Sequence, residues 1–407
     1  MTRRSNLYQS WLWPFAVVAS ATAVLVACGS ETSGNQNTAR LTDTPDTAQV
    51  DLPVLVIGES ASPDDDFMFP LAAGVDSNGN VYVFDAQTLE LRRFSSTGAS
   101  ALIAKRGGGP GELTNPTSFL FDSVSVGVWE GRAGRYTMLS MTGQVIDEVN
   151  LGIVAPPRVT TVLQSASAGE FILANISEVT PHPDSIRGKD RIVFLRVSSG
   201  APAYDTLYSY ERPAASLSFH GGRARVIDPG PRYGPIVLFD AEDPGFVRLD
   251  RPTPDRRGVA EFTLQRIAVN GTLLNHVRYS TSATAIPEHV RDSLAAIVDG
   301  LPPEISGSAP LQASWPAYYP PVAGMLLSKH GDGRIWLELP PSDQEVGSSW
   351  IILDRTLRPL LHVRLPRRLQ YPIAAGPYIA GTVEGEDGTR VIYTFRVPGS
   401  PASEAGN

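Results

Sequence analysis

A repeated pair of strands is the feature that most constrains the fold of this chain. Residues 81–98 (VYVFDAQTLELRRFSSTG) align without a gap on residues 126–143 (VGVWEGRAGRYTMLSMTG), at an offset of 45. Both segments run through a short apolar strand, an acidic residue, a turn, a more polar strand and Thr-Gly. Weaker copies occur at 261–271, 333–339 and 348–358. A period of ~40–50 residues with about four strands per unit predicts a β-propeller.

The apolar runs in this repeat indicate how the sheets pack. Residues 81–84 and 351–353 are continuously apolar, whereas a strand with one solvent-exposed face alternates. Continuous runs need burial on both faces, which small sheets stacked face against face provide. The 37 glycines and 34 prolines suit a turn-rich all-β fold.

The segments GNVYVFD (79–85) and RGGGPGEL (106–113) resemble the bacterial six-bladed β-propeller family related to NHL repeats, which is TolB-like. The resemblance implies an all-β, six-bladed β-propeller over residues 50–398, followed by a disordered tail at 399–407. Within this propeller, DLPVLVIG (51–58) is expected to be a strand that joins the last blade. Such a strand closes the ring and removes two exposed sheet edges.

One segment does not fit a blade. Residues 286–300 (IPEHVRDSLAAIVDG) carry apolar side chains on one helical face, Pro287 suits the first helical position, and Gly300 suits the stop. The sequence therefore predicts one short α-helix inserted between blades. The whole insertion is expected to span residues 283–322, and its second half is rich in proline.

The N-terminus resembles a bacterial lipoprotein signal peptide with its lipobox. Cys28 is the only cysteine of the chain, it follows Leu-Val-Ala after an apolar run, and Arg3 and Arg4 precede that run. The resemblance implies a signal peptide at 1–27, cleavage before Cys28, and acylation of Cys28 that anchors the protein in membrane lipid. An uncleaved N-terminal transmembrane anchor is the alternative.

The anchor implies a location in the bacterial cell envelope. Gly29, rather than Asp, follows the cysteine, which resembles lipoproteins of the outer membrane that face the periplasm. Residues 28–49 are small, polar and poor in aromatics, and they are expected to form a flexible tether.

The charge of the chain argues against one class of partner. The formal net charge is −8, and removing Arg3 and Arg4 with the signal peptide takes it to −10. Nucleic acid is bound mainly by Lys and Arg on phosphates, so no nucleic-acid partner is expected. With Cys28 acylated, no disulfide can form.

Two acidic positions and one glycine-rich segment have competing interpretations. A phosphate-binding loop needs a helix after it, but a strand pattern follows residues 106–112, so this segment is expected to be a tight connection fixed by Arg106 and Glu112. Asp85 and Glu130 occupy equivalent repeat positions. We expect them to accept hydrogen bonds from turn amides, and cation binding is the alternative.

The histidines form no recognisable metal-binding motif. None of the six falls in an HExxH or HxH pattern, so no metal and no cofactor is expected. His220 and His330 lie beside glycines, in segments from which a cluster at a central channel could be built. Solvated loop histidines are the favoured alternative.

Aromatic residues in the insertion are the main candidates for ligand binding. Trp315, Tyr318 and Tyr319 lie in SWPAYYPP, and such rings give large contact areas at low entropic cost. They would present a surface to a protein, peptide or glycan. Packing of the insertion onto the blades is the favoured alternative.

Three functions remain open from the sequence. The first is a lipid-anchored binding or scaffold protein, which the absence of catalytic signatures favours. The second is a propeller enzyme, either a lyase or a metal-dependent, lactonase-like hydrolase, with residues gathered at the central channel. The third is a sensory subunit that binds a small ligand. Histidine and carboxylate side chains converging at the channel would indicate the enzyme, and apolar, small side chains there would indicate the scaffold.

Overall fold

The computed structural model describes most of the chain from Ala39 to Pro398. The described ranges are 39–41, 46–58, 67, 69–122, 124–151, 159–166, 170–180, 189–198, 204–213, 217–220, 223–226, 234–255, 258–299, 316–329, 332–341, 347–385 and 388–398. They belong to one compact unit, Asn37–Asn407. The predicted signal peptide, Cys28 and the predicted C-terminal tail (399–407) lie outside the described residues.

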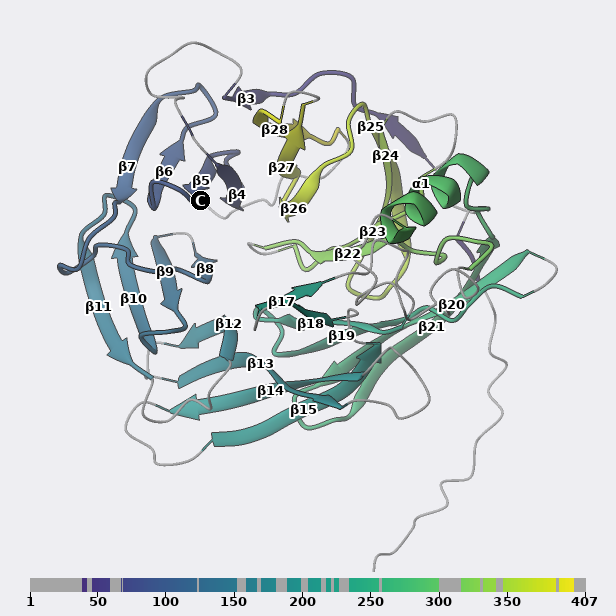
Figure 1. Cartoon of the computed structure of the whole chain (residues 1–407), viewed down its shortest axis with the longest axis horizontal. Coiled ribbons are helices and arrows are strands. Elements are labelled where there is room, and N and C mark those ends of the chain that lie inside the picture. The colour runs from purple at the N-terminus through teal and green to yellow at the C-terminus, as the bar shows by residue number, and fades with distance from the viewer. Residues whose placement is uncertain are drawn as a thin grey trace, which may run out of the picture. The chain divides into compact units, whose positions relative to one another are not determined.

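Six antiparallel units of four strands, two of them extended by a fifth strand, form the described fold together with one separate hairpin (Figure 1). The first blade contains β4 (Pro70–Val75), β5 (Val81–Asp85), β6 (Glu90–Phe94) and β7 (Ser100–Ala104). The second contains β8 (Ser118–Phe121), β9 (Ser125–Glu130), β10 (Arg135–Ser140) and β11 (Val145–Asn150). The third contains β12 (Val159–Ala166), β13 (Glu170–Thr180), β14 (Lys189–Ser198) and β15 (Tyr204–Pro213).

The other three blades follow the same antiparallel order. The fourth contains β18 (Ile236–Asp240), β19 (Gly245–Asp250), β20 (Val259–Ala268) and β21 (Leu273–Ser282). The fifth contains β22 (Gly324–Leu327), β23 (Ile335–Glu338), β24 (Ser348–Leu353) and β25 (Pro359–Leu365). The sixth contains β26 (Gln370–Ala375), β27 (Tyr378–Glu384), β28 (Arg390–Arg396) and β3 (Leu55–Ile57). A separate hairpin, β16 (Leu217–His220) and β17 (Arg223–Val226), precedes the fourth blade.

Hydrophobic cores lie between consecutive blades, which makes the arrangement a propeller. Six clusters of buried side chains each join two neighbouring sheets. In the second of these junctions, for example, Trp129 and Tyr136 of the second blade pack with Phe171 of the third. The last junction joins Ala380 of the sixth blade to Val81 of the first, so the ring is closed. The predicted all-β, six-bladed propeller is therefore confirmed.

Burial on both faces explains the continuous apolar runs. Every residue of β5 and of β24 is buried, as the run at 81–84 and the run at 351–353 predict. The outer strand β11, by contrast, is mostly exposed. The second strands of the first two blades are thus fully buried, whereas the fourth strand of the second blade is not.

The predicted closing strand is also confirmed. Strand β3 pairs in antiparallel register with β28, with Ile57 opposite Ile392 and Leu55 opposite Thr394. The fourth strand of the sixth blade therefore comes from the N-terminal side of the chain. Ile57 is 2% exposed and packs at the junction between the sixth and the first blade.

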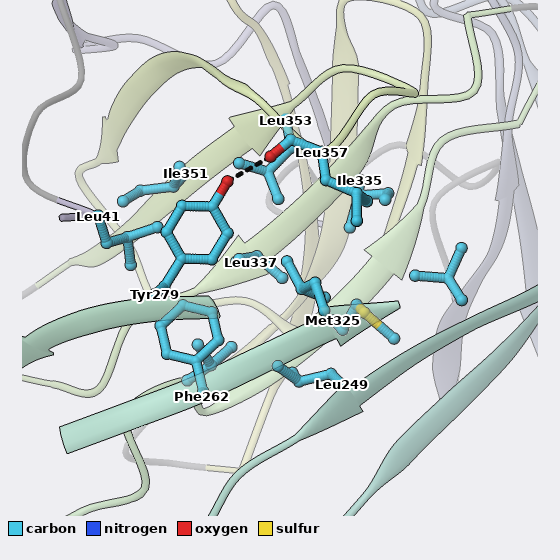
Figure 2. Close-up of a cluster of buried hydrophobic side chains, with 13 residues drawn as sticks. Leu41, Leu249, Phe262, Tyr279, Met325, Ile335, Leu337, Ile351, Leu353 and Leu357 are labelled. Atoms are coloured by element: carbon cyan, nitrogen blue, oxygen red, sulfur yellow. Dashed lines mark hydrogen bonds between the residues drawn. The ribbon is translucent and has the colours of Figure 1, made fainter. Parts of the chain in front are cut away.

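The end of the predicted tether differs from the expectation of a flexible segment. Strand β1 (Ala39–Arg40) pairs in parallel with β21 as a fifth strand of the fourth blade, and β2 (Thr47–Gln49) does the same on β25 of the fifth blade. Backbone pairing needs no apolar side chains, which is why a polar segment can form these strands. The buried side chains of Leu41 and Val50, which follow β1 and β2, pack into the cores between blades. Leu41 lies beside the Tyr279 ring (Figure 2).

The inserted helix is present as predicted. Helix α1 spans Glu288–Asp299, and the Pro287 carbonyl accepts a hydrogen bond from the Arg291 amide. Ile286 is buried beside its first turn. No helix within the described part of the chain is long and apolar enough to cross a membrane.

Because each blade is antiparallel, its connections alternate between two ends. We call "lower end" the one that holds the turns from first to second and from third to fourth strands. The "upper end" holds the turns from second to third strands and the connections between blades. Contacts between neighbouring first strands, such as β4 with β26 and β22 with β26, place these strands innermost.

Candidate functional site

A carboxylate interrupts the core pattern at the upper end of the fifth blade. Residues 333–339 (GRIWLEL) align with 79–85 (GNVYVFD), so Glu338 occupies the position that Phe84 holds in the first blade. Its side chain is 16% exposed, and burial raises the pKa of this carboxyl above its ordinary value. An acid at an apolar core position is costly unless it is used or paired.

Arg368 is the charged partner of Glu338. Its Nε lies 3.8 Å from Oε1 of Glu338, and its positive charge opposes the rise of the Glu338 pKa without cancelling it. Arg368 comes from the connection between the fifth and sixth blades, thirty residues after Glu338. The Arg368 side chain is more than half exposed, so the pair is open to solvent on one side.

A hollow surrounds this pair. It is a shallow depression, with room for about 10 Å³ of solvent, and it is lined by Glu338, Leu339, Pro340, Pro341, Gly347, Ser348, Ser349 and Arg368. Part of the wall is rigid, because the rings of two consecutive prolines, Pro340 and Pro341, restrict the backbone there. A carboxyl acceptor and guanidinium donors at one spot can bind the amide, hydroxyl or amino groups of a ligand.

Ser348 is held by two structural hydrogen bonds, and neither partner is a general base. Its Oγ donates to the Arg367 carbonyl at 3.2 Å and accepts from Nε1 of the buried Trp350 at 3.0 Å. An activated serine nucleophile needs a hydrogen bond to a general base. This hydroxyl therefore orients the wall of the hollow.

The insertion returns to the fifth blade close to this end. The Tyr319 amide donates to the Thr284 carbonyl at 2.8 Å, and Tyr318 forms an antiparallel bridge with Ala285. The buried Arg251 donates to the carbonyls of Val322 and Ala323 at 3.0 Å each. The two ends of the insertion are thus fastened to each other and to the fourth blade.

Tyr318 and Tyr319 are half-buried, which favours the packing interpretation over a fully presented aromatic surface. Trp315, the third predicted aromatic, lies outside the described residues. His330 does too, while His220 ends β16 with its backbone paired to Arg223. The structure therefore brings the two tyrosines together and does not test the predicted roles of the other three residues.

Metal binding finds no support in the described ranges. No group of three or more His, Cys, Asp or Glu side chains there could hold a metal ion. The acidic residues of the repeat serve the turns: Asp85 accepts from the amides of Gln87 and Thr88 at 2.8 and 3.2 Å. Glu130 accepts from the amides of Thr114 and Asn115 at 2.7 and 2.9 Å. The prediction that these acids accept from turn amides is thus confirmed for Asp85, whereas the amides that bind Glu130 belong to the connection before the second blade.

The electrostatics of Glu130 follow from these contacts. Burial raises its pKa, but hydrogen bonds from Thr114, Asn115 and Arg135 outweigh that effect and lower the pKa overall. The glycine-rich connection is also structural: Glu112 accepts from the Gly109 amide at 2.9 Å, and Arg106 forms a backbone bridge with Leu113. The tight connection that the sequence predicts at residues 106–112 is therefore present.

A lysine at the lower end is a second unusual charge. Lys329 follows β22, and its amide donates to the Ala374 carbonyl of the sixth blade at 3.0 Å. The side chain reaches solvent, yet the protein around it desolvates the ammonium and lowers its pKa. Sequence reasoning did not single out Lys329, Glu338 or Arg368. The available signal in the sequence was that Glu338 aligns with a repeat position that is apolar in the first blade.

No family model matches this chain, and no curated protein matches it either. Among solved structures, a member of the DUF4221 family from Bacteroides vulgatus is 12% identical, with 81% of this chain and 95% of that chain covered and a TM-score of 0.41. A streptogramin B lyase is 10% identical, with 84% and 97% covered and a TM-score of 0.34. A luciferin-regenerating enzyme is 9% identical, with 82% and 92% covered and a TM-score of 0.34.

Likenesses this distant carry no argument about function. The fold class rests on the six sheets and the six cores between them. The finer prediction, membership of the family related to NHL repeats, stays a prediction because no family model matches.

Proposed function

We propose that this chain is a lipid-anchored, extracytoplasmic β-propeller that binds a protein, peptide or cell-envelope ligand. The observation that carries the proposal is the composition of the innermost strands. Among the six first strands of the blades, Asp240 is the one charged residue. Its carboxylate is buried and already hydrogen-bonded, since it accepts from the Glu242 amide and from Nη2 of Arg266.

A propeller enzyme that works at its axis needs titratable side chains where the first strands meet. Almost entirely uncharged first strands favour a rigid ring that presents its loops and upper end to a partner. In this proposal the ligand binds at the hollow beside Glu338 and Arg368. The ligand contributes hydrogen-bond donors to the carboxyl and acceptors to the guanidinium.

The lipid anchor is tested separately from the ligand site. The intact mass of the protein extracted from membranes should exceed that of the chain from Cys28 to Asn407 by the mass of its acyl groups. Cys28→Ala should move the protein to the soluble fraction. A membrane-extracted chain without added mass on Cys28 would contradict the anchor and leave the ligand site to its own test.

The ligand site is tested with isolated peptidoglycan and solubilised envelope proteins as probes. Glu338→Gln and Arg368→Ala should each weaken binding at least tenfold, because each truncates one charge-assisted interaction. Glu384→Gln is the matched control, since Glu384 lies at the same end of the sixth blade and pairs with Arg390 at 3.4 Å. Equal binding by all variants would contradict the assignment of the hollow.

A propeller enzyme is the second candidate, and one observation favours it. Burial raises the pKa of the Glu338 carboxyl above its ordinary value, and a raised pKa is a common property of carboxyl groups that act as general acids. Turnover of a lactone or peptide substrate that disappears in Glu338→Gln and persists in Glu384→Gln would favour a hydrolase or lyase over a binding protein.

A further inference from the structure

Tyr371 has a strained backbone conformation that its packing does not explain. Among the described residues, three other than glycine have a positive φ angle: Leu89 at 58°, Leu357 at 66° and Tyr371 at 49°. Leu357 is fully buried and Leu89 packs against the core between the first two blades, so packing offsets the cost of their left-handed conformation. Tyr371 is 65% exposed. Strain that burial does not compensate is typical of residues at functional sites.

A bulge at the start of β26, the innermost strand of the sixth blade, contains this tyrosine. The register between β26 and β27 shifts after Gln370, so Tyr371 and Pro372 both lie opposite Gly381. A Cβ atom on Gly381 would lie 2.7 Å from the Leu369 Cβ and 3.1 Å from the Gln370 carbonyl oxygen, so a side chain there would displace the bulge. Proline has no amide to donate and occurs in sheets at edges and bulges. Bulges of this kind redirect a side chain.

The bulge lies next to the charged pair of the hollow. Arg368 precedes Tyr371 by three residues, so their Cα atoms are at most ~11 Å apart. Between them, Leu369 is buried in the core that contains Trp350, which fixes this segment on the fifth and sixth blades. Gln370 is exposed, and its amide can both donate and accept hydrogen bonds. A carboxyl, a guanidinium, an amide and an aromatic ring therefore lie within one short stretch of surface.

The groups on this surface suit a ligand that is rich in hydroxyl groups. Each hydroxyl both donates and accepts, so neighbouring hydroxyls can satisfy a carboxyl and a guanidinium at once. The C–H groups on one face of a sugar ring pack on an aromatic ring, whose face carries partial negative charge. An anionic ligand would be attracted by Arg368 but repelled by Glu338. The side chain of a peptide needs a well-packed pocket as its anchor, whereas the hollow is shallow.

We propose that a saccharide of the cell envelope binds here, with one sugar ring stacked on Tyr371 and hydroxyl groups hydrogen-bonded to Glu338 and Arg368. The inference rests on the proposed binding function and adds the class of its ligand and a further binding residue. The bulge holds the Tyr371 side chain in place before the ligand arrives. Less conformational entropy is therefore lost on binding, which is the benefit that offsets the strain.

Peptidoglycan supplies matched glycan and peptide probes. An amidase separates it into glycan strands and stem peptides, and calorimetry measures binding of the purified protein to each, with an array of other envelope oligosaccharides as a third probe. The protein should bind saccharide and not stem peptide. Tyr371→Ala should weaken this binding about tenfold, and Tyr371→Phe should preserve it, because stacking needs the ring and not the hydroxyl. Tyr204→Ala, which removes a 46% exposed tyrosine of the third blade, is the matched control and should bind like the parent protein.

A glycine substitution separates ligand binding from a structural role. Tyr371→Gly removes the ring and relieves the left-handed conformation, so this variant should melt no lower than the parent protein and should bind saccharide as weakly as Tyr371→Ala. The inference is overturned if Tyr371→Gly binds like the parent protein, if it melts at a lower temperature, or if only stem peptides or envelope proteins bind. In that last case, a loss of binding in Glu338→Gln would leave the proposed function standing. If the parent protein binds none of the probes, both fall.

Discussion

Replacing Ile57 by alanine should destabilise the propeller where its first and last blades meet. Ile57 is 2% exposed and packs with Val75 and Val81 of the first blade and Ile392 of the sixth. Such a truncation costs about 2–5 kcal/mol. The 360 residues from Ala39 to Pro398 give an unfolding entropy of ~0.76 kcal/mol/K, at about 2.1 cal/mol/K per residue. The expected decrease of the melting temperature is therefore ~3–7 °C.

Scanning calorimetry measures this decrease directly. Leu52→Ala is the control, because Leu52 lies in the same segment and is 78% exposed. An exposed substitution changes stability by at most about 0.5 kcal/mol, which corresponds to less than ~1 °C here. If Ile57→Ala melts no lower than Leu52→Ala, the ring is not closed by β3 and the reasoning is refuted.

Truncation extends the same argument to the whole N-terminal segment. A chain that begins at residue 50 lacks β1, β2 and the buried Leu41, and one that begins at residue 60 also lacks β3. Melting temperatures should decrease in that order. Equal melting of the two truncated chains would show that β3 does not stabilise the ring.

Three predictions concern titrating groups, and denaturation monitored as a function of pH measures each of them. The pKa of Glu130 is lowered, so the stabilisation of the folded state by this carboxylate is lost as the pH falls through that pKa. Glu130→Gln should therefore lower the free energy of unfolding by about 1.5–3 kcal/mol at pH 7 and by less in acid. Burial raises the pKa of Glu338, so the ionised carboxylate destabilises the folded protein at higher pH. Glu338→Gln should therefore stabilise the protein at pH 7 but not below about pH 4, whereas Glu384→Gln should show no such pH dependence. Burial raises the pKa of Tyr279 to about 12, so stability should fall between about pH 10 and 12, and Tyr279→Phe should remove part of that fall. The same substitution should cost ~1 kcal/mol at neutral pH, because the Tyr279 hydroxyl donates to the Leu357 carbonyl (Figure 2).

The sequence predicts those parts of the fold that depend on apolar burial in a repeat. The run at 81–84 is apolar because it is buried on both faces, and the same rule identifies β24. Strands β1 and β2 could not be predicted in this way, because they are held by backbone pairing and by one buried side chain each, Leu41 and Val50. A segment with so little apolar content gives no periodic signal.

The candidate site escapes prediction for a different reason. Glu338 and Arg368 come from a strand and from a later connection, so only the closed ring brings them together. What the sequence does contain is a departure from its own repeat, since an acid stands where Phe84 fills the core of the first blade. In a propeller, the residues at equivalent positions of the different blades can be compared with one another. A costly substitution at an equivalent position therefore points to function more directly than any short motif in this chain.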